Sequence, residues 1–155
     1  MQAPTSSQLE NAKILTGSNG LREVFDATLD NKEKMLRTAL VDKPLVYLIG
    51  EEYSEEYIHK RKESGIHLKS LRFGNEKNVD KPNHTDYKNI DKEVRNAPSG
   101  LSVYSSIVIW DDNVVIVNSN KDIEIIWITN QLYANTLKNW YEYIWSQSSI
   151  GTIET

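Results

Sequence analysis

The polar side chains most suited to chemistry stand in an otherwise apolar stretch, residues 103–128. Tyr104 and Ser106 carry hydroxyls two residues apart at its start, Asp111 follows five residues later, and Asn118 comes after a further apolar run. Polar groups on buried strands need partners, and they can bind a small polar ligand where the fold supplies none. Each also has a purely structural explanation: local hydrogen bonds for the hydroxyls and the amide, and a turn for Asp111 in Asp-Asp-Asn.

Two other arrangements suggest chemistry less strongly. His84 beside Asp86 could serve a metal or acid–base site, but no second histidine stands at ligand spacing, which favours a solvated loop. The turn at residues 16–20 could hold an anion on free N–H groups before a helix. No lysine follows it as in a phosphate-binding loop, so an ordinary strand-to-helix joint is favoured. The chain has no cysteine, which excludes thiolate metal sites. We therefore expect no metal and no cofactor.

Strands and helices alternate along the chain, which predicts an α/β fold. Residues 103–128 form three β-branched and aromatic runs separated by Asp/Asn-rich joints, with residues 111–113 as a tight turn between the first two. The spacing of apolar residues predicts the other elements. These are strands at 12–15 and 66–73, a helix from the turn at 16–20 to Leu29 capped by Ser18 or Asn19, a helix from Pro44 to a stop at Gly65, and a helix over 130–149 capped by Thr129 or Asn130. Residues 35–41 could extend the first helix or form a strand, and the resemblance described below favours the strand.

The last of these helices carries a broad aromatic face. Such a stripe is typical of a core or of an interface between chains, and less often of a ligand pocket. We assign Trp140, Tyr141 and Trp145 to a predicted interface in a homodimer.

Composition limits the class of protein. A chain of 155 residues fits one domain, which we place at residues 10–149 between a flexible tail or linker-helix remnant at 1–9 and a flexible tail at 150–155. A net charge of −4 argues against direct nucleic-acid binding through bulk electrostatics. No apolar run approaches the roughly 18 residues of a membrane-spanning helix, and no signal peptide is visible. We expect a soluble cytoplasmic protein without membrane contact.

Four phrases carry a resemblance to a known family: AKILTGSNGLREVFDATL, EYIHKRKESGIHLKSL, IVIWDDNVVIVNS and YANTLKNWYEYIW. In this order and spacing they resemble the C-terminal effector domain of TrmB-like transcriptional regulators, from about Leu9 to Trp145. The resemblance implies a phospholipase D-like fold, a mixed β-sheet flanked by α-helices in a single domain. It also implies a small-molecule effector, such as a sugar or other metabolite.

Active phospholipase D-like enzymes carry His-x-Lys-x4-Asp followed by Gly-Ser, in which the histidine is the nucleophile and the lysine binds phosphate. With Asp111 in the Asp place, Tyr104 replaces the histidine, Ser106 replaces the lysine, and Asn118-Ser119 replaces Gly-Ser. A phenol is a poor substitute for imidazole because it keeps its proton at neutral pH. A serine supplies no positive charge for a phosphoryl transition state. We therefore expect no catalytic residues, and a degenerate site whose ligand-binding candidates are Tyr104, Ser106, Asp111 and Asn118.

The leading interpretation is a non-catalytic ligand-sensing and dimerisation domain of a TrmB-like transcriptional regulator. Such regulators carry a winged helix-turn-helix and a coiled-coil linker, which nothing in this sequence resembles. We thus expect either part of a longer regulator or a stand-alone sensor that reaches DNA only through an attached or partner domain. The alternatives are a phospholipase D-like phosphodiesterase or nuclease with an altered active site, and a purely structural dimerisation domain.

Overall fold

A computed structural model describes residues 11–41, 45–73 and 92–150 of the chain. Their helices and strands follow in the order β1 (Ala12–Thr16), α2 (Gly17–Thr28), β2 (Met35–Val41), the 3₁₀ helix η1 (Leu45–Leu48), α3 (Glu51–Glu63), β3 (His67–Phe73), β4 (Lys92–Asn96), β5 (Ser106–Trp110), β6 (Asn113–Asn118), β7 (Glu124–Thr129), α4 (Gln131–Ser146) and β8 (Ser149–Ile150). The tails expected at 1–9 and, apart from Ile150, at 150–155 lie outside the described residues.

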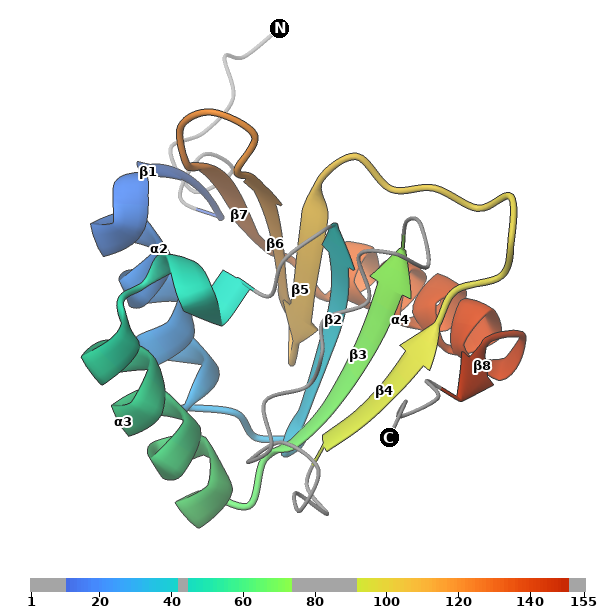
Figure 1. The fold of residues 1–155 in the computed structure, drawn as a ribbon, viewed down its shortest axis with the longest axis horizontal. Coiled ribbons are helices and arrows are strands. Elements are labelled where there is room, and N and C mark those ends of the chain that lie inside the picture. The colour runs from blue at the N-terminus through green and yellow to red at the C-terminus, as the bar shows by residue number, and fades with distance from the viewer. Residues whose placement is uncertain (1–10, 42–44, 74–91, 151–155) are drawn as a thin grey trace, which may run out of the picture.

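The described strands form one mixed sheet of eight, in the spatial order β1-β7-β6-β5-β2-β3-β4-β8 (Figure 1). Strands β2, β3 and β4 are parallel, and β5 runs antiparallel to β2. The three-stranded unit expected within residues 103–128 is confirmed as β5, β6 and β7, joined antiparallel. Trp110 pairs with Asn113, so Asp111 and Asp112 form a two-residue hairpin turn, as predicted.

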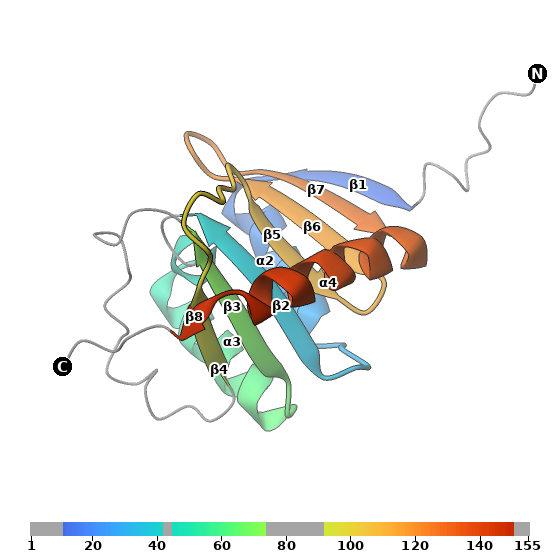
Figure 2. The same ribbon diagram turned by 90° about the vertical axis from the view of Figure 1, so that its right-hand side faces the viewer.

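Helices cover both faces of the sheet, which confirms the predicted α/β fold (Figures 1 and 2). On one face, α2 and α3 pack on a core that includes Leu21, Tyr57 and Val108. On the other face, α4 packs on a second core through Tyr141 and Trp145. Alternate strand residues point to opposite faces, so each central strand contributes to both cores. No helix in the described part of the chain is long and apolar enough to cross a membrane.

The helix expected from Pro44 to Gly65 is wrong in its first half. Its start at Pro44 lies outside the described residues, and a 3₁₀ turn, η1, precedes a break at Gly50. Gly50 has φ 95°, which a residue with a side chain rarely adopts, and α3 begins only after it. The negative charges of Glu51 and Glu52 in the first turn of α3 interact favourably with the positive end of the helix dipole.

Of the N-caps predicted for the two other helices, one is wrong and one is confirmed. The cap expected at Ser18 or Asn19 is wrong, because both lie inside α2, whose N-cap is Thr16. Asn130 caps α4 as predicted, and its side chain accepts hydrogen bonds from the N–H groups of Leu132 and Tyr133.

Candidate functional site

The carboxyl ends of β2, β3 and β4 meet the amino end of β5 at one edge of the sheet. This follows from the register, in which β2 runs parallel to β3 and Ala39 near its end pairs with Ile107 of β5. The carboxyl edge of parallel strands is where α/β sheets bind ligands. The structure thus places Tyr104 and Ser106, at the start of β5, at the edge where a site is expected.

Ser106 is buried at this edge, with 2% of its surface exposed. Its hydroxyl accepts a hydrogen bond from the backbone N–H of Val41, with 3.1 Å between Oγ and N. A serine hydroxyl has one proton to donate besides its acceptor sites. The Ser106 hydroxyl therefore first links β5 to the end of β2, and it keeps its proton and one acceptor lone pair for a ligand.

Tyr104 has the opposite environment. It lies two residues before β5 and is 91% exposed. Its phenol is accessible to a ligand.

Asp111 and Asn118 do not join these two hydroxyls. Asp111 lies at the far end of β5, roughly 16 Å along the strand from Ser106. Its carboxylate accepts the N–H groups of Lys32 and Glu33, both at 3.0 Å, and ties the hairpin to the segment between α2 and β2. Ser106 and Val117 are paired and point to the same face of the sheet. Asn118 is the next residue along β6, so its side chain points to the opposite face. Its side chain accepts the N–H of Asn120 at 3.2 Å.

The start of α2 borders an open depression of about 560 Å³, lined by Thr16, Gly17, Ser18 and residues 121–124. This is the turn that the sequence offers as an anion cradle. The N–H of Gly17 is already donated to the carbonyl of Ile123 at 2.9 Å. Asp122 and Glu124 outnumber Lys121 on the lining, and their charge opposes an anion. The geometry favours a strand-to-helix joint.

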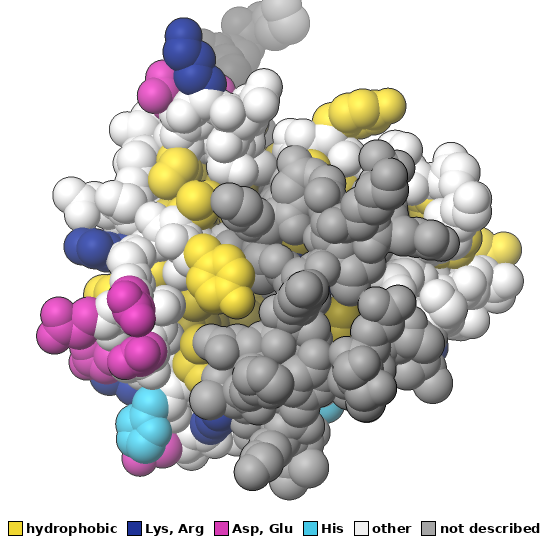
Figure 3. Space-filling view, in the orientation of Figure 1, with side chains coloured by type: hydrophobic (Ala, Val, Ile, Leu, Met, Phe, Trp, Pro, Cys, Tyr) yellow, Lys and Arg dark blue, Asp and Glu magenta, His cyan; other side chains and the backbone are white. Residues whose placement is uncertain are grey.

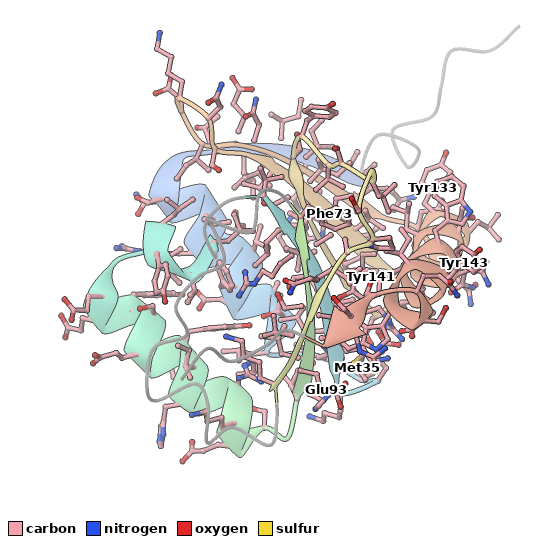
Figure 4. All side chains as sticks on the ribbon, turned by 45° about the vertical axis from the view of Figure 1, so that its right-hand side comes forward. Met35, Phe73, Glu93, Tyr133, Tyr141 and Tyr143 are labelled. Carbon is pink, nitrogen blue, oxygen red and sulfur yellow. The ribbon has the colours of Figure 1, made fainter. Side chains whose placement is uncertain are left out.

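The aromatic interface expected on α4 needs correction. Tyr141 and Trp145 are buried within this chain, at 4% and 5% exposure, because both pack on its own sheet. The Tyr141 hydroxyl donates to the carbonyls of Thr38 at 2.9 Å and Lys69 at 3.0 Å, and its burial raises its pKa. Figure 4 shows Tyr141 between α4 and the sheet. Of the three expected residues, Trp140 remains available, at 61% exposure.

Sequence reasoning missed a charged network beneath α4. Glu142 accepts Arg37 Nε at 2.8 Å and Lys69 Nζ at 3.0 Å. Partial burial raises the pKa of Glu142, but the hydrogen bonds and charges of Arg37 and Lys69 outweigh it, and the pKa lies below its usual value. Alternating polar residues on β2 and β3 were the signal for it. Paired in this way, these groups hold the helix to the sheet.

Metal chemistry finds no support in the described part of the chain, where no three His, Cys, Asp or Glu side chains are grouped to hold an ion. The pair His84 and Asp86 lies outside the described residues.

No family model matches the chain, and no curated protein matches its sequence. Solved structures match its fold. TrmBL2, an archaeal chromatin protein that binds DNA, superposes with a TM-score of 0.62 at 16% identity over 94% of this chain and 56% of its own. Nuc of Salmonella typhimurium, a phospholipase D family member, has a TM-score of 0.61 at 11% identity. NucT of Helicobacter pylori has a TM-score of 0.59 at 11% identity. These two are matched over 90% of this chain and 98% of theirs.

The comparisons give the fold that the sequence implied, phospholipase D-like and shared with a TrmB-like protein. The chain spans a little over half the length of TrmBL2. At these identities the likeness concerns the fold and not the chemistry.

Proposed function

We propose that the chain is a non-catalytic effector domain of a TrmB-like transcriptional regulator. It binds a small polar metabolite, such as a sugar, and pairs with a second copy. It reaches DNA only through an attached or partner DNA-binding domain. The fold it shares with TrmBL2 over 94% of its length supports this class of protein.

The observation that carries the proposal is what occupies the lysine and aspartate places of the catalytic pattern. Ser106, in the lysine place, is an uncharged buried tie to Val41. Asp111, in the aspartate place, is held by the N–H groups of Lys32 and Glu33. Phosphoryl transfer needs fixed positive charge at the transition state, and Ser106 supplies none. The degenerate edge retains hydroxyls suited to hydrogen-bonding a polar ligand.

A ligand would act as an effector by binding one arrangement of the paired domains better than another. Tyr104 is the ligand-binding group that we assign to this edge, since its hydroxyl is exposed while that of Ser106 is partly engaged.

Thermal unfolding across a metabolite set that includes mono- and disaccharides tests the proposal. A ligand at 100 times its Kd stabilises by about 2.7 kcal/mol, or roughly 5–10 °C in Tm for a domain of this size. We expect Tyr104→Phe to reduce the shift. Glu55→Gln is the control, since Glu55 is exposed and lies on α3. No shift with any metabolite, or an equal shift in Tyr104→Phe, contradicts ligand sensing at this edge.

A phosphodiesterase with an altered nucleophile is the second candidate, favoured by the fold shared with Nuc. Its test is hydrolysis of bis(p-nitrophenyl) phosphate in the presence of EDTA. Turnover that disappears in Tyr104→Phe and persists in Glu55→Gln would establish it in place of the effector function. A third, purely structural pairing domain would show neither ligand binding nor hydrolysis.

A further inference from the structure

The side of α4 that faces away from the sheet carries no charge. The helix has two charged residues, Lys138 and Glu142, and both turn toward the sheet side. Lys138 pairs with Glu33 at 3.1 Å, and Glu142 pairs with Arg37 at 2.8 Å. The exposed positions of the helix are instead apolar or neutral: Gln131, Leu132, Tyr133, Asn135, Thr136, Asn139, Trp140, Tyr143 and Ser146.

Large side chains form a second stripe on α4, apart from the buried one. Tyr133, Thr136, Trp140 and Tyr143 follow one another at spacings of three, four and three, which places them along one side of the helix. The three aromatic residues are 58%, 61% and 69% exposed in chain order. Figure 4 shows Tyr133 and Tyr143 projecting outward while Tyr141 lies against the sheet. This stripe, which we call the outer α4 stripe, lacks a partner in the described part of the chain.

The helix on the other face of the sheet has an ordinary solvated surface. Exposed positions of α3 carry charges, among them Glu52, Glu55, Lys60 and Glu63. Acidic side chains gather over α3 in Figure 3. Charge is depleted and Tyr and Trp are enriched in the centres of protein interfaces. The outer α4 stripe thus has an interface composition that α3 lacks.

A second exposed apolar surface lies on the same side of the sheet as α4. Ile14 of β1 pairs with Ile126 of β7, and the two are 80% and 47% exposed. Ile125, next to Ile126, lies in the core under α2 and α3, so Ile126 faces the side on which α4 lies. Figure 2 shows that α4 crosses part of this side and leaves β1 and β7 uncovered.

We infer that the outer α4 stripe is the surface through which two copies of this chain pair, around a two-fold axis. A two-fold interface brings one patch against itself, so a charge near the axis would face its own copy. The stripe avoids this although the chain carries a net charge of −4. A nucleic acid or an acidic partner would need cations, which the stripe does not offer.

The area available fits a second copy. A Tyr or Trp side chain buries on the order of 150–250 Å², so three at about 60% exposure offer roughly 300–450 Å². A standard interface buries about 800 Å² on each partner. Leu132 of α4, 74% exposed, and the exposed Ile14 and Ile126 add apolar area on the same side of the molecule.

The pairing rests on the proposed function, and its test is separate from ligand binding. The experiment is sedimentation velocity over a concentration series with wild type, Trp140→Arg and Tyr143→Arg. We expect a wild-type dimer and a loss of dimer affinity of at least tenfold in both variants, since each arginine would place an unpaired positive charge in the apolar interface. His59→Arg on exposed α3 adds the same charge and keeps the wild-type affinity. Arginine favours helix, and circular dichroism verifies folding.

A second readout does not depend on the arginine variants. The chain has no cysteine, so Thr136→Cys creates a single thiol in the stripe, and Glu55→Cys creates one on α3. We expect a short bismaleimide to link two copies of Thr136→Cys and not of Glu55→Cys. A monomeric wild type, unchanged dimer affinity in folded arginine variants, or no linkage in Thr136→Cys overturns the inference. A monomer that still shows the Tyr104-dependent ligand shift would leave ligand sensing intact.

Discussion

The hydroxyl of Ser106 accepts the backbone N–H of Val41 at a distance of 3.1 Å, at the point where the ladder between β5 and β2 ends. The Ser106 hydroxyl accepts the Val41 N–H as a main-chain carbonyl would if the ladder continued by one more residue. A lysine at position 106 could not accept this hydrogen bond, because an ammonium group is a donor only. Ser106, which stands in the lysine place of the catalytic pattern, therefore also stabilises the edge of the sheet.

Ser106→Ala is predicted to destabilise the domain by about 1–3 kcal/mol, because it leaves the Val41 N–H without its acceptor. Tyr104→Phe is predicted to change the free energy of unfolding by less than about 0.5 kcal/mol, since the side chain is in solvent. Urea unfolding of both variants measures the difference. Equal stabilities would contradict the role of the Ser106 tie. The contrast also makes Tyr104→Phe the cleaner variant for ligand binding.

The Asp111 carboxylate is predicted to contribute about 1–2 kcal/mol through its two backbone N–H partners. Asp111→Ala should lose most of this and should also strain the turn, where φ is 47°. Asp111→Asn keeps an acceptor and tolerates that conformation, so it should lose less. Urea unfolding measures the three stabilities, and we expect the wild type to be the most stable, Asp111→Asn the next and Asp111→Ala the least. An alanine variant as stable as the wild type would show that the hydrogen bonds from Lys32 and Glu33 to Asp111 do not stabilise the domain.

Local sequence patterns predicted much of the fold. The hairpin within 103–128 followed from β-branched runs and an Asp-Asp-Asn joint, and the Asn130 cap followed from its place before an apolar repeat. The break at Gly50 was missed because the apolar spacing of Leu45, Leu48 and Ile49 continues into Tyr53 as if one helix ran through. Periodicity records which face is apolar and does not record a change of backbone conformation.

The candidate site was less predictable because its members depend on distant partners. Nothing near Asp111 in sequence indicates the N–H groups of Lys32 and Glu33, which lie 79 and 78 residues away. Asn118 fell on the opposite face from Ser106 because of the register, which the sequence alone does not determine. On α4, Trp140 and Tyr141 are neighbours in one aromatic run, and only packing on the sheet shows that Tyr141 is buried and Trp140 exposed.

Glu142 is predicted to make the domain sensitive to acid. Its pKa lies below the usual 4.5, so its stabilising effect is fully present above that pH and is lost as the pH falls through the lowered value. Wild type should therefore lose more stability than Glu142→Gln between about pH 5 and pH 3. At neutral pH the variant should be the less stable protein. Thermal melts across this range measure both, and parallel pH profiles would exclude a role for the contacts with Arg37 and Lys69.

Tyr57 is predicted to make the domain sensitive to alkali. Its phenol is buried and lies 2.7 Å from the Thr28 hydroxyl, and burial raises its pKa from 10.0 to about 12 despite that hydrogen bond. A raised pKa means that the stabilising effect is fully present below pH 10 and is lost as the pH rises toward 12.

Tyr57→Phe removes both the hydrogen bond and the titration. At about pH 8 it should be less stable than wild type by about 0.5–1.5 kcal/mol. Between pH 10 and 12 the gap should narrow by up to roughly 1.4 kcal/mol per pH unit, because only the wild type must keep this phenol protonated to stay folded. Burial also raises the pKa of Tyr141, but this residue is present in both proteins, so its effect cancels in the comparison. Urea unfolding at several alkaline pH values measures the gap, and a constant gap would show that Tyr57 does not resist ionisation.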